Sequence, residues 1–176
     1  MISRRTFLGT TALPLTRGSP SPHDIRQRFA EMWERNRTYT LEVAERMPDS
    51  GYGFRPVPEV RSFAEQLAHI GQAVDSSTRL LTGASPAGAT GRTVIGDPST
   101  LRTELDASMV AFADAWLGLR ASDLERSVPW SRRLGSDTTH TLEGVALTAW
   151  HHTAHHRAQC IVYLRLNGLE PPAYVD

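Results

Sequence analysis

Four of the chain's seven histidines stand within six residues of one another, at His151, His152, His155 and His156. Side chains four residues apart share one face of a helix, so this run offers two pairs of neighbouring imidazoles. Two imidazoles one helical turn apart bind one transition-metal ion in the two-histidine helical zinc motif. A third ligand has to come from another segment, and the remaining histidines are His23, His69 and His140. The spacing therefore leaves two alternatives, a metalloprotein and a helical bundle without a metal.

The two histidine pairs differ in the helix face on which they lie. At about 100° per residue, His152 and His156 share a face that is otherwise apolar or small, whereas His151 and His155 lie roughly 60–100° away toward its flank. The other members of the shared face are Leu142, Val145, Ala149, Cys160 and Tyr163. Two imidazoles in an apolar wall are unfavourable unless they are hydrogen-bonded or bound to a metal. We therefore expect His152 and His156 to face the bundle, either as ligands or as hydrogen-bonded groups that line a wet groove.

His69 is the candidate third ligand. It flanks the apolar stripe of a second predicted helix, made of Phe63, Leu67, Ile70 and Val74. A histidine at the edge of a stripe either points toward a neighbouring helix or stays partly exposed as an ordinary polar residue. Together, His69, His152 and His156 make a three-nitrogen site whose fourth coordination position is open. That arrangement is typical of catalytic rather than structural zinc.

Four segments carry helical periodicity, and almost no part of the chain shows the alternation of a strand. The sequence therefore predicts an all-α four-helix bundle. The helices are expected over residues 23–46, 62–81, 99–119 and 141–167. Long loops are expected between the second and third helices and between the third and fourth. The second of these loops is expected to hold a short turn of helix and a small extended pair. Ser62 and Glu65 fit a capping box at the start of the second helix, and Gly83 is expected to end it.

The bulk composition fits one soluble domain and excludes several classes of function. A chain of 176 residues with 40% hydrophobic and 22% charged residues is long enough to bury a core. Its formal net charge is zero, which gives no reason to expect a nucleic-acid partner. No uninterrupted apolar run of about 18 residues is present, so no stable membrane span is expected. The lone cysteine, Cys160, excludes an internal disulfide, and the absence of lysine excludes Schiff-base chemistry.

The first residues resemble an export signal. Residues 3–8 read Ser-Arg-Arg-Thr-Phe-Leu, which is similar to the twin-arginine signal. The alternative is a disordered basic tail, because the following apolar stretch is short and no clear cleavage site follows it. We therefore expect residues 1–20 to be a signal-like or disordered tail and residues 21–176 to be the bundle domain. The protein is expected to be exported or periplasmic if the segment is functional, and cytoplasmic otherwise.

Two motifs resemble those of the DinB/YfiT-like family. They are Arg61-Ser-Phe-Ala-Glu-Gln-Leu-Ala-His69 and His152-Thr-Ala-His-His156-Arg157-Ala-Gln159, and the resemblance runs from about residue 25 to the C-terminus. In that family the first motif supplies one histidine, and the second supplies two more, just before the arginine and four residues earlier. The resemblance thus implies His69, His152 and His156 as metal ligands, the same three that the helix faces favour. The family usually has glycine where Ala158 stands. The extra methyl group affects how closely two helices pack more than it affects the metal site.

The resemblance also implies chemistry. Such proteins are four-helix bundles that hold a divalent metal, often zinc or nickel, and many are homodimers. Relatives include glutathione- or mycothiol-dependent isomerases and bacillithiol transferases, in which a metal holds a low-molecular-weight thiol as thiolate. We therefore expect a small-molecule substrate and a metal-dependent hydrolase or thiol-dependent transferase. The alternative is a non-catalytic metal-binding or structural bundle, and the sequence identifies no catalytic residue.

Other residues near the histidines have more ordinary interpretations. Cys160 is either a fourth ligand or, as the favoured reading, a small core residue. Tyr163 either approaches the site or, more in keeping with its position, belongs to the core. Gln159 either supports a ligand or joins two helices through a hydrogen bond. Arg157 is expected to point aside and pair with a carboxylate.

Overall fold

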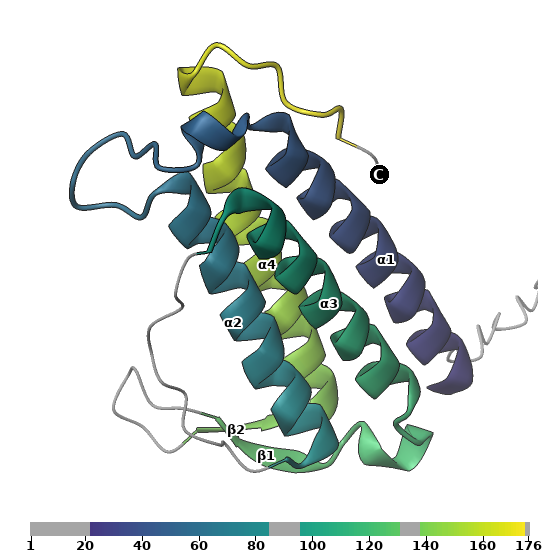
Figure 1. The fold of residues 1–176 in the computed structure, drawn as a ribbon. Helices are drawn as coiled ribbons and strands as arrows, with labels where there is room; N and C mark the ends of the chain where they lie inside the picture. The colour runs from purple at the N-terminus through teal and green to yellow at the C-terminus, as the bar shows by residue number, and fades with distance from the viewer. Residues whose placement is uncertain (1–21, 85–95, 131–137, 175–176) are drawn as a thin grey trace, which may run out of the picture.

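The computed structural model describes residues 22–84, 96–130 and 138–174. Over these ranges the chain forms four long helices, which confirms the predicted all-α bundle (Figure 1). They are α1 (Pro22–Arg46), α2 (Phe63–Thr82), α3 (Pro98–Leu117) and α4 (Leu142–Leu166). The signal-like segment and the expected boundary after residue 20 lie outside the described residues, so both stay predictions.

The four helices form a bundle in which α3 and α4 each pack against both α1 and α2 (Figure 1). This arrangement puts α1 and α2 at opposite corners. It gives α4 two separate seams, one with α2 and one with α1. Because each residue turns the helix by about 100°, neighbouring residues of α4 point into different seams.

The core between α1 and α3 is aromatic. The rings of Trp33 and Phe112 lie with centroids 4.2 Å apart, and those of Phe29 and Trp116 lie 4.6 Å apart. The indole of Trp33 is fully buried and donates a 2.9 Å hydrogen bond to the backbone oxygen of Met109. These contacts fix α1 against α3.

Local capping chemistry sets the ends of the helices. At the start of α2 the Ser62 hydroxyl accepts from the backbone of Glu65, and the Glu65 carboxylate accepts from that of Ser62, which confirms the capping box. Gly83 ends α2 with φ at 71°, a left-handed conformation that glycine adopts without strain. Helix α3 begins slightly before the expected Ser99, because Asp97 caps it and Pro98 occupies its first turn.

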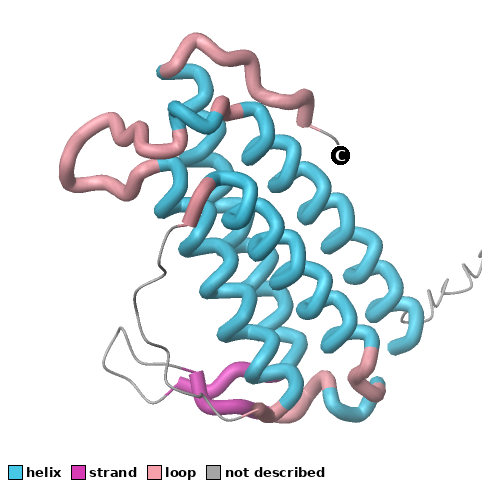
Figure 2. Tube along the Cα trace, viewed as in Figure 1, coloured by secondary structure: helices cyan, strands magenta, loops and turns pink. Residues whose placement is uncertain are grey.

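The connections carry small elements. A turn of 3-10 helix, η1 (Asp49–Gly51), follows α1. A second one, η2 (Ala121–Asp123), precedes the antiparallel strands β1 (Ser127–Trp130) and β2 (Thr138–Thr141), in which Val128 pairs with His140 (Figure 2). The helical turn and the extended pair expected between the third and fourth helices are thus confirmed. Residues 85–95, in the expected loop between the second and third helices, lie outside the described residues.

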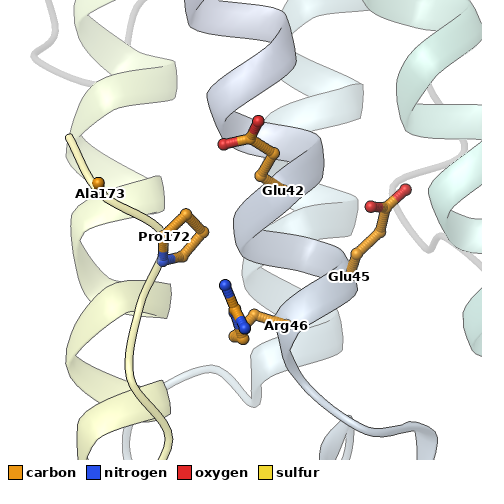
Figure 3. Close-up of a pocket in the computed structure, with 5 residues that line it drawn as sticks. All are labelled: Glu42, Glu45, Arg46, Pro172 and Ala173. Carbon is orange, nitrogen blue, oxygen red and sulfur yellow. The ribbon is translucent and has the colours of Figure 1, made fainter. Parts of the chain in front are cut away.

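After α4 the chain turns back and lies along α1. The hydroxyl of Tyr39 on α1 donates a 3.3 Å hydrogen bond to the backbone oxygen of Pro172, and the rings of Tyr39 and Tyr174 meet edge to face at 5.6 Å. Figure 3 shows Pro172 beside Arg46 of α1. Tyr174 also lines a cavity with Trp150 and Arg157 of α4, so the C-terminal segment lies beside the seam between α1 and α4. Within the described part of the chain, no helix is long and apolar enough to cross a membrane.

Candidate metal centre

The seam between α2 and α4 brings three histidines together. His69 lies in the second turn of α2, and His152 and His156 lie one turn apart near the middle of α4. One ring nitrogen of each falls within 4.8 Å of the others. A tetrahedral zinc ion at Zn–N distances near 2.1 Å holds its nitrogens about 3.4 Å apart, so the three rings would have to draw closer when an ion binds.

The neighbouring histidines lie elsewhere. His151 and His155 are exposed, as the helix-face argument predicts, whereas His156 is buried and His152 is half-buried. His140 lies on β2, and the side chain of His23 lies outside the described residues. The fold therefore selects one pair from the run of four and adds His69 to it.

A chain of hydrogen bonds orients His156. Its Nδ1 lies 2.7 Å from Oε1 of Gln66, a buried residue of α2. The amide nitrogen of Gln66 is engaged elsewhere, since it donates to Oε1 of Gln159 at 2.6 Å. An amide oxygen only accepts, so Nδ1 of His156 carries the proton and donates. The Nε2 lone pair is then available to a metal, as in most histidine-bound metal sites.

The chain of amides continues to the surface of α4. Gln159 Nε2 lies 3.0 Å from Nε2 of the exposed His155. The hydroxyl of Tyr163 sits 3.4 Å from Gln66 Nε2 and donates to the backbone oxygen of Arg61 at 2.9 Å. Gln159 thus joins α4 to α2, and through Gln66 it also supports His156. The predicted hydrogen bond of Gln159 between two helices is confirmed, and its predicted role in supporting a metal ligand stays a prediction.

Burial sets the charge state of the histidines. Loss of solvation lowers the pKa of His156 to about 3, and the neighbouring His152 and His69 add repulsion of a cationic ring. Burial also lowers the pKa of His152, helped by His155 and Arg61. Both rings are therefore neutral near pH 7, the form in which imidazole binds metals.

The donor set fits a transition metal. Within the described residues, the buried Nδ1 of His152 has no hydrogen-bond partner. A buried polar atom without a partner is unfavourable and rare. Three neutral imidazoles suit zinc, copper, iron or nickel. A metal at this place would draw the three rings together and compensate for their lost solvation.

Two nearby side chains lie away from the three histidines. Cys160 is fully buried in the apolar core, and burial raises the pKa of its thiol to about 12. It is not part of the metal-binding group, in keeping with the core interpretation. Tyr163 is also a buried core residue, although its hydroxyl reaches Gln66.

The prediction for Arg157 is wrong. Its guanidinium is buried and bonds to oxygens of Asn36 and Thr40 on α1, and within the described residues no carboxylate pairs with it. The reason is angular, because one residue of helix rotates the side chain by about 100° from His156, away from α2 and into the seam with α1.

No role for Gln66 was predicted from the sequence, although its side chain is the hydrogen-bond partner of His156. The available signal was its position three residues before His69, on the same side of the helix. Spacing alone did not show that its amide points across to α4.

These features define a class, a four-helix bundle that gathers three histidines between two of its helices. The chain belongs to the DinB superfamily, whose family model matches residues 15–160. The fold is similar to that of a DinB-like protein from Bacillus subtilis, with 23% identity, a TM-score of 0.68, and coverage of 84% of this chain and 97% of that one. A DinB-like protein from Bacillus cereus has 19% identity, a TM-score of 0.64, and coverage of 85% and 97%. No curated protein matches the chain.

Proposed function

We propose that the protein binds one divalent transition-metal ion, zinc or nickel, through His69, His152 and His156. The observation that carries this proposal is the convergence of three ring nitrogens within 4.8 Å, with His156 held by Gln66. Three protein ligands leave a fourth position for water or a substrate thiolate. The site is therefore best suited to a metal-dependent hydrolase or thiol-dependent transferase acting on a small molecule.

The residues around the site support this chemistry. A bound metal would supply a hydroxide or thiolate nucleophile at neutral pH, because it lowers the pKa of the group it coordinates. Gln66 keeps His156 in one tautomer and one orientation, so its lone pair stays directed into the site. The guanidinium of Arg61 lies close enough to lower the pKa of both α4 histidines, and the same positive charge favours an anionic ligand.

The first experiment asks whether the site binds metal. Protein purified without a nickel column should carry about one divalent ion per chain by elemental analysis. His69→Ala should remove most of it, because two imidazoles alone hold the ion weakly, whereas His151→Ala should leave it unchanged. A folded, metal-free wild type, or equal loss in both variants, would contradict the site.

The second experiment separates an enzyme from a non-catalytic metal-binding bundle. Metal-loaded protein would be assayed for thiol transfer to electrophiles with several low-molecular-weight thiols, and for hydrolysis of ester and amide substrates. Turnover that His69→Ala abolishes would support an enzyme. Stoichiometric metal with no turnover would favour the non-catalytic alternative.

Export and assembly are separate parts of the proposal. Fusion of residues 1–25 to a reporter should direct export, and Arg4→Lys with Arg5→Lys should reduce it. An exported chain would rely on water more than on thiols, which are mainly cytoplasmic cofactors.

Light scattering should give twice the mass of one chain if the protein is a homodimer.

A further inference from the structure

A second polar cluster lies on the other seam of α4. The face that α1 and α4 share contains a cavity of about 160 Å³. Its walls include Arg157 and Trp150 of α4, Asn36 and Tyr39 of α1, and Tyr174 of the C-terminal segment. None of these residues belongs to the three-histidine site.

The cavity contains a buried cation that has no counterion among the described residues. Arg157 is only 8% exposed, and within the described residues it is paired with no carboxylate. Its hydrogen bonds go to neutral oxygens, namely the backbone and side-chain oxygens of Asn36 and the hydroxyl of Thr40. Nη1 donates all of these hydrogen bonds. Within the described residues, the N–H groups of Nε and Nη2 therefore remain for a ligand. Buried charges in proteins are normally paired, and a guanidinium fork matches a carboxylate.

The described residues that line the cavity with Arg157 include no carboxylate. Asn36 is 5% exposed, and its Nδ2 is buried without a hydrogen-bond partner in the described chain. Arg35, an exposed residue, adds a second cation to the lining. A ligand that brings hydrogen-bond acceptors and negative charge would compensate for what this cavity lacks.

The remaining walls define the body of the ligand. The guanidinium carbon of Arg157 lies 4.8 Å from the ring centre of Tyr39, and the ring of Tyr174 meets Tyr39 edge to face. Trp150 supplies a third aromatic side chain. An engineered cavity of about 150 Å³ is known to hold a benzene molecule, so this one has room for a single six-membered ring.

We propose that the cavity between α1 and α4 binds a small organic carboxylate with a flat apolar body, about the size of benzoate. The carboxylate pairs with Arg157, and the body lies among Tyr39, Trp150 and Tyr174. The inference is independent of the metal, because His69 and His156 face the opposite seam.

The test is calorimetric titration of the full-length, metal-loaded chain with benzoate. One molecule should bind per chain, and benzamide, which has the same shape but no charge, should bind about tenfold or more weakly, since hydrogen bonds to charged groups are the stronger ones. Acetate, which lacks the ring, should also bind more weakly. No saturable benzoate binding, or equal binding of benzamide, would overturn the proposal.

Two variants locate the bound benzoate. Asn36→Asp keeps the side-chain shape but places the chain's own carboxylate beside Arg157, so benzoate affinity should fall about tenfold or more while the metal content is kept. His69→Ala should bind benzoate as the wild type does, even without metal. The opposite pattern, with binding lost in His69→Ala and kept in Asn36→Asp, would place benzoate on the metal and reject the cavity.

Discussion

The two seams of α4 are built from adjacent residues and have opposite chemistry. Toward α2, His156 joins His69 and His152, and the seam collects nitrogen lone pairs suited to a cation. Toward α1, Arg157 lies among neutral oxygens and aromatic rings, and the seam collects N–H donors suited to an anion. Each seam also leaves one buried polar atom without a partner in the described chain, Nδ1 of His152 and Nδ2 of Asn36.

The difference shows how one helix serves two environments. A rotation of about 100° per residue separates neighbouring side chains enough to send them to different partners. The partners then decide the chemistry, because α2 offers Gln66 and His69, whereas α1 offers Asn36 and Thr40. The comparison predicts that each seam can be altered without loss of the other.

The largest expected effect on folding comes from the α1 seam. Arg157→Ala removes hydrogen bonds to Asn36 and Thr40 and the contact with Tyr39, so the free energy of unfolding should fall by about 2 kcal/mol. Urea unfolding followed by circular dichroism measures it. The matched control is Arg165→Ala, an exposed arginine of the same helix, which should change stability by less than about 0.5 kcal/mol. Similar values for the two variants would show that the buried guanidinium contributes nothing to the seam.

An intermediate effect is expected in the α2 seam. Gln66→Leu removes the acceptor of the His156 Nδ1 proton and should lower metal affinity by about 10–100-fold, the usual consequence of losing such a partner. Competition with a chromophoric chelator measures this affinity. Gln72→Leu, an exposed change on α2, should have no effect, and benzoate binding should be unchanged in both variants. Unaltered metal affinity in Gln66→Leu would remove Gln66 from the site.

The smallest effect is expected at Cys160, which lies in the core between the two seams. Cys160→Ala should keep the full metal content and reduce stability by about 1 kcal/mol, because a small buried atom is lost. Elemental analysis and urea unfolding measure the two quantities. A drop in metal content would make the thiol a fourth ligand and extend the α2 seam into the core.

Much of this architecture was predictable because it depends on short-range rules. The capping box of Ser62 and Glu65 and the stop at Gly83 involve residues close in sequence. The choice of His152 and His156 over His151 and His155 follows from helix geometry and the apolar face alone. The DinB-like motifs pointed to His69 as their distant partner.

The partners across the seams were not predictable in the same way. Gln66 and His156 are separated by 90 positions, and Asn36 and Arg157 by 121. Spacing rules do not reach over such separations, so Gln66 had no assigned role and Arg157 was expected to meet a carboxylate. Either pairing depends on how far two helices rotate and slide against each other.

The sequence by itself determined the four helices, both ends of α2 and the imidazoles available on each face, because capping and periodicity are properties of neighbouring residues. The tertiary structure alone decided that His156 meets Gln66 and that Arg157 is buried against Asn36, with no carboxylate partner in the described part of the chain. The physical reason is that helix packing fixes the environment of each buried polar group. That environment, in turn, makes one seam of α4 a place for a cation and the other a place for an anion.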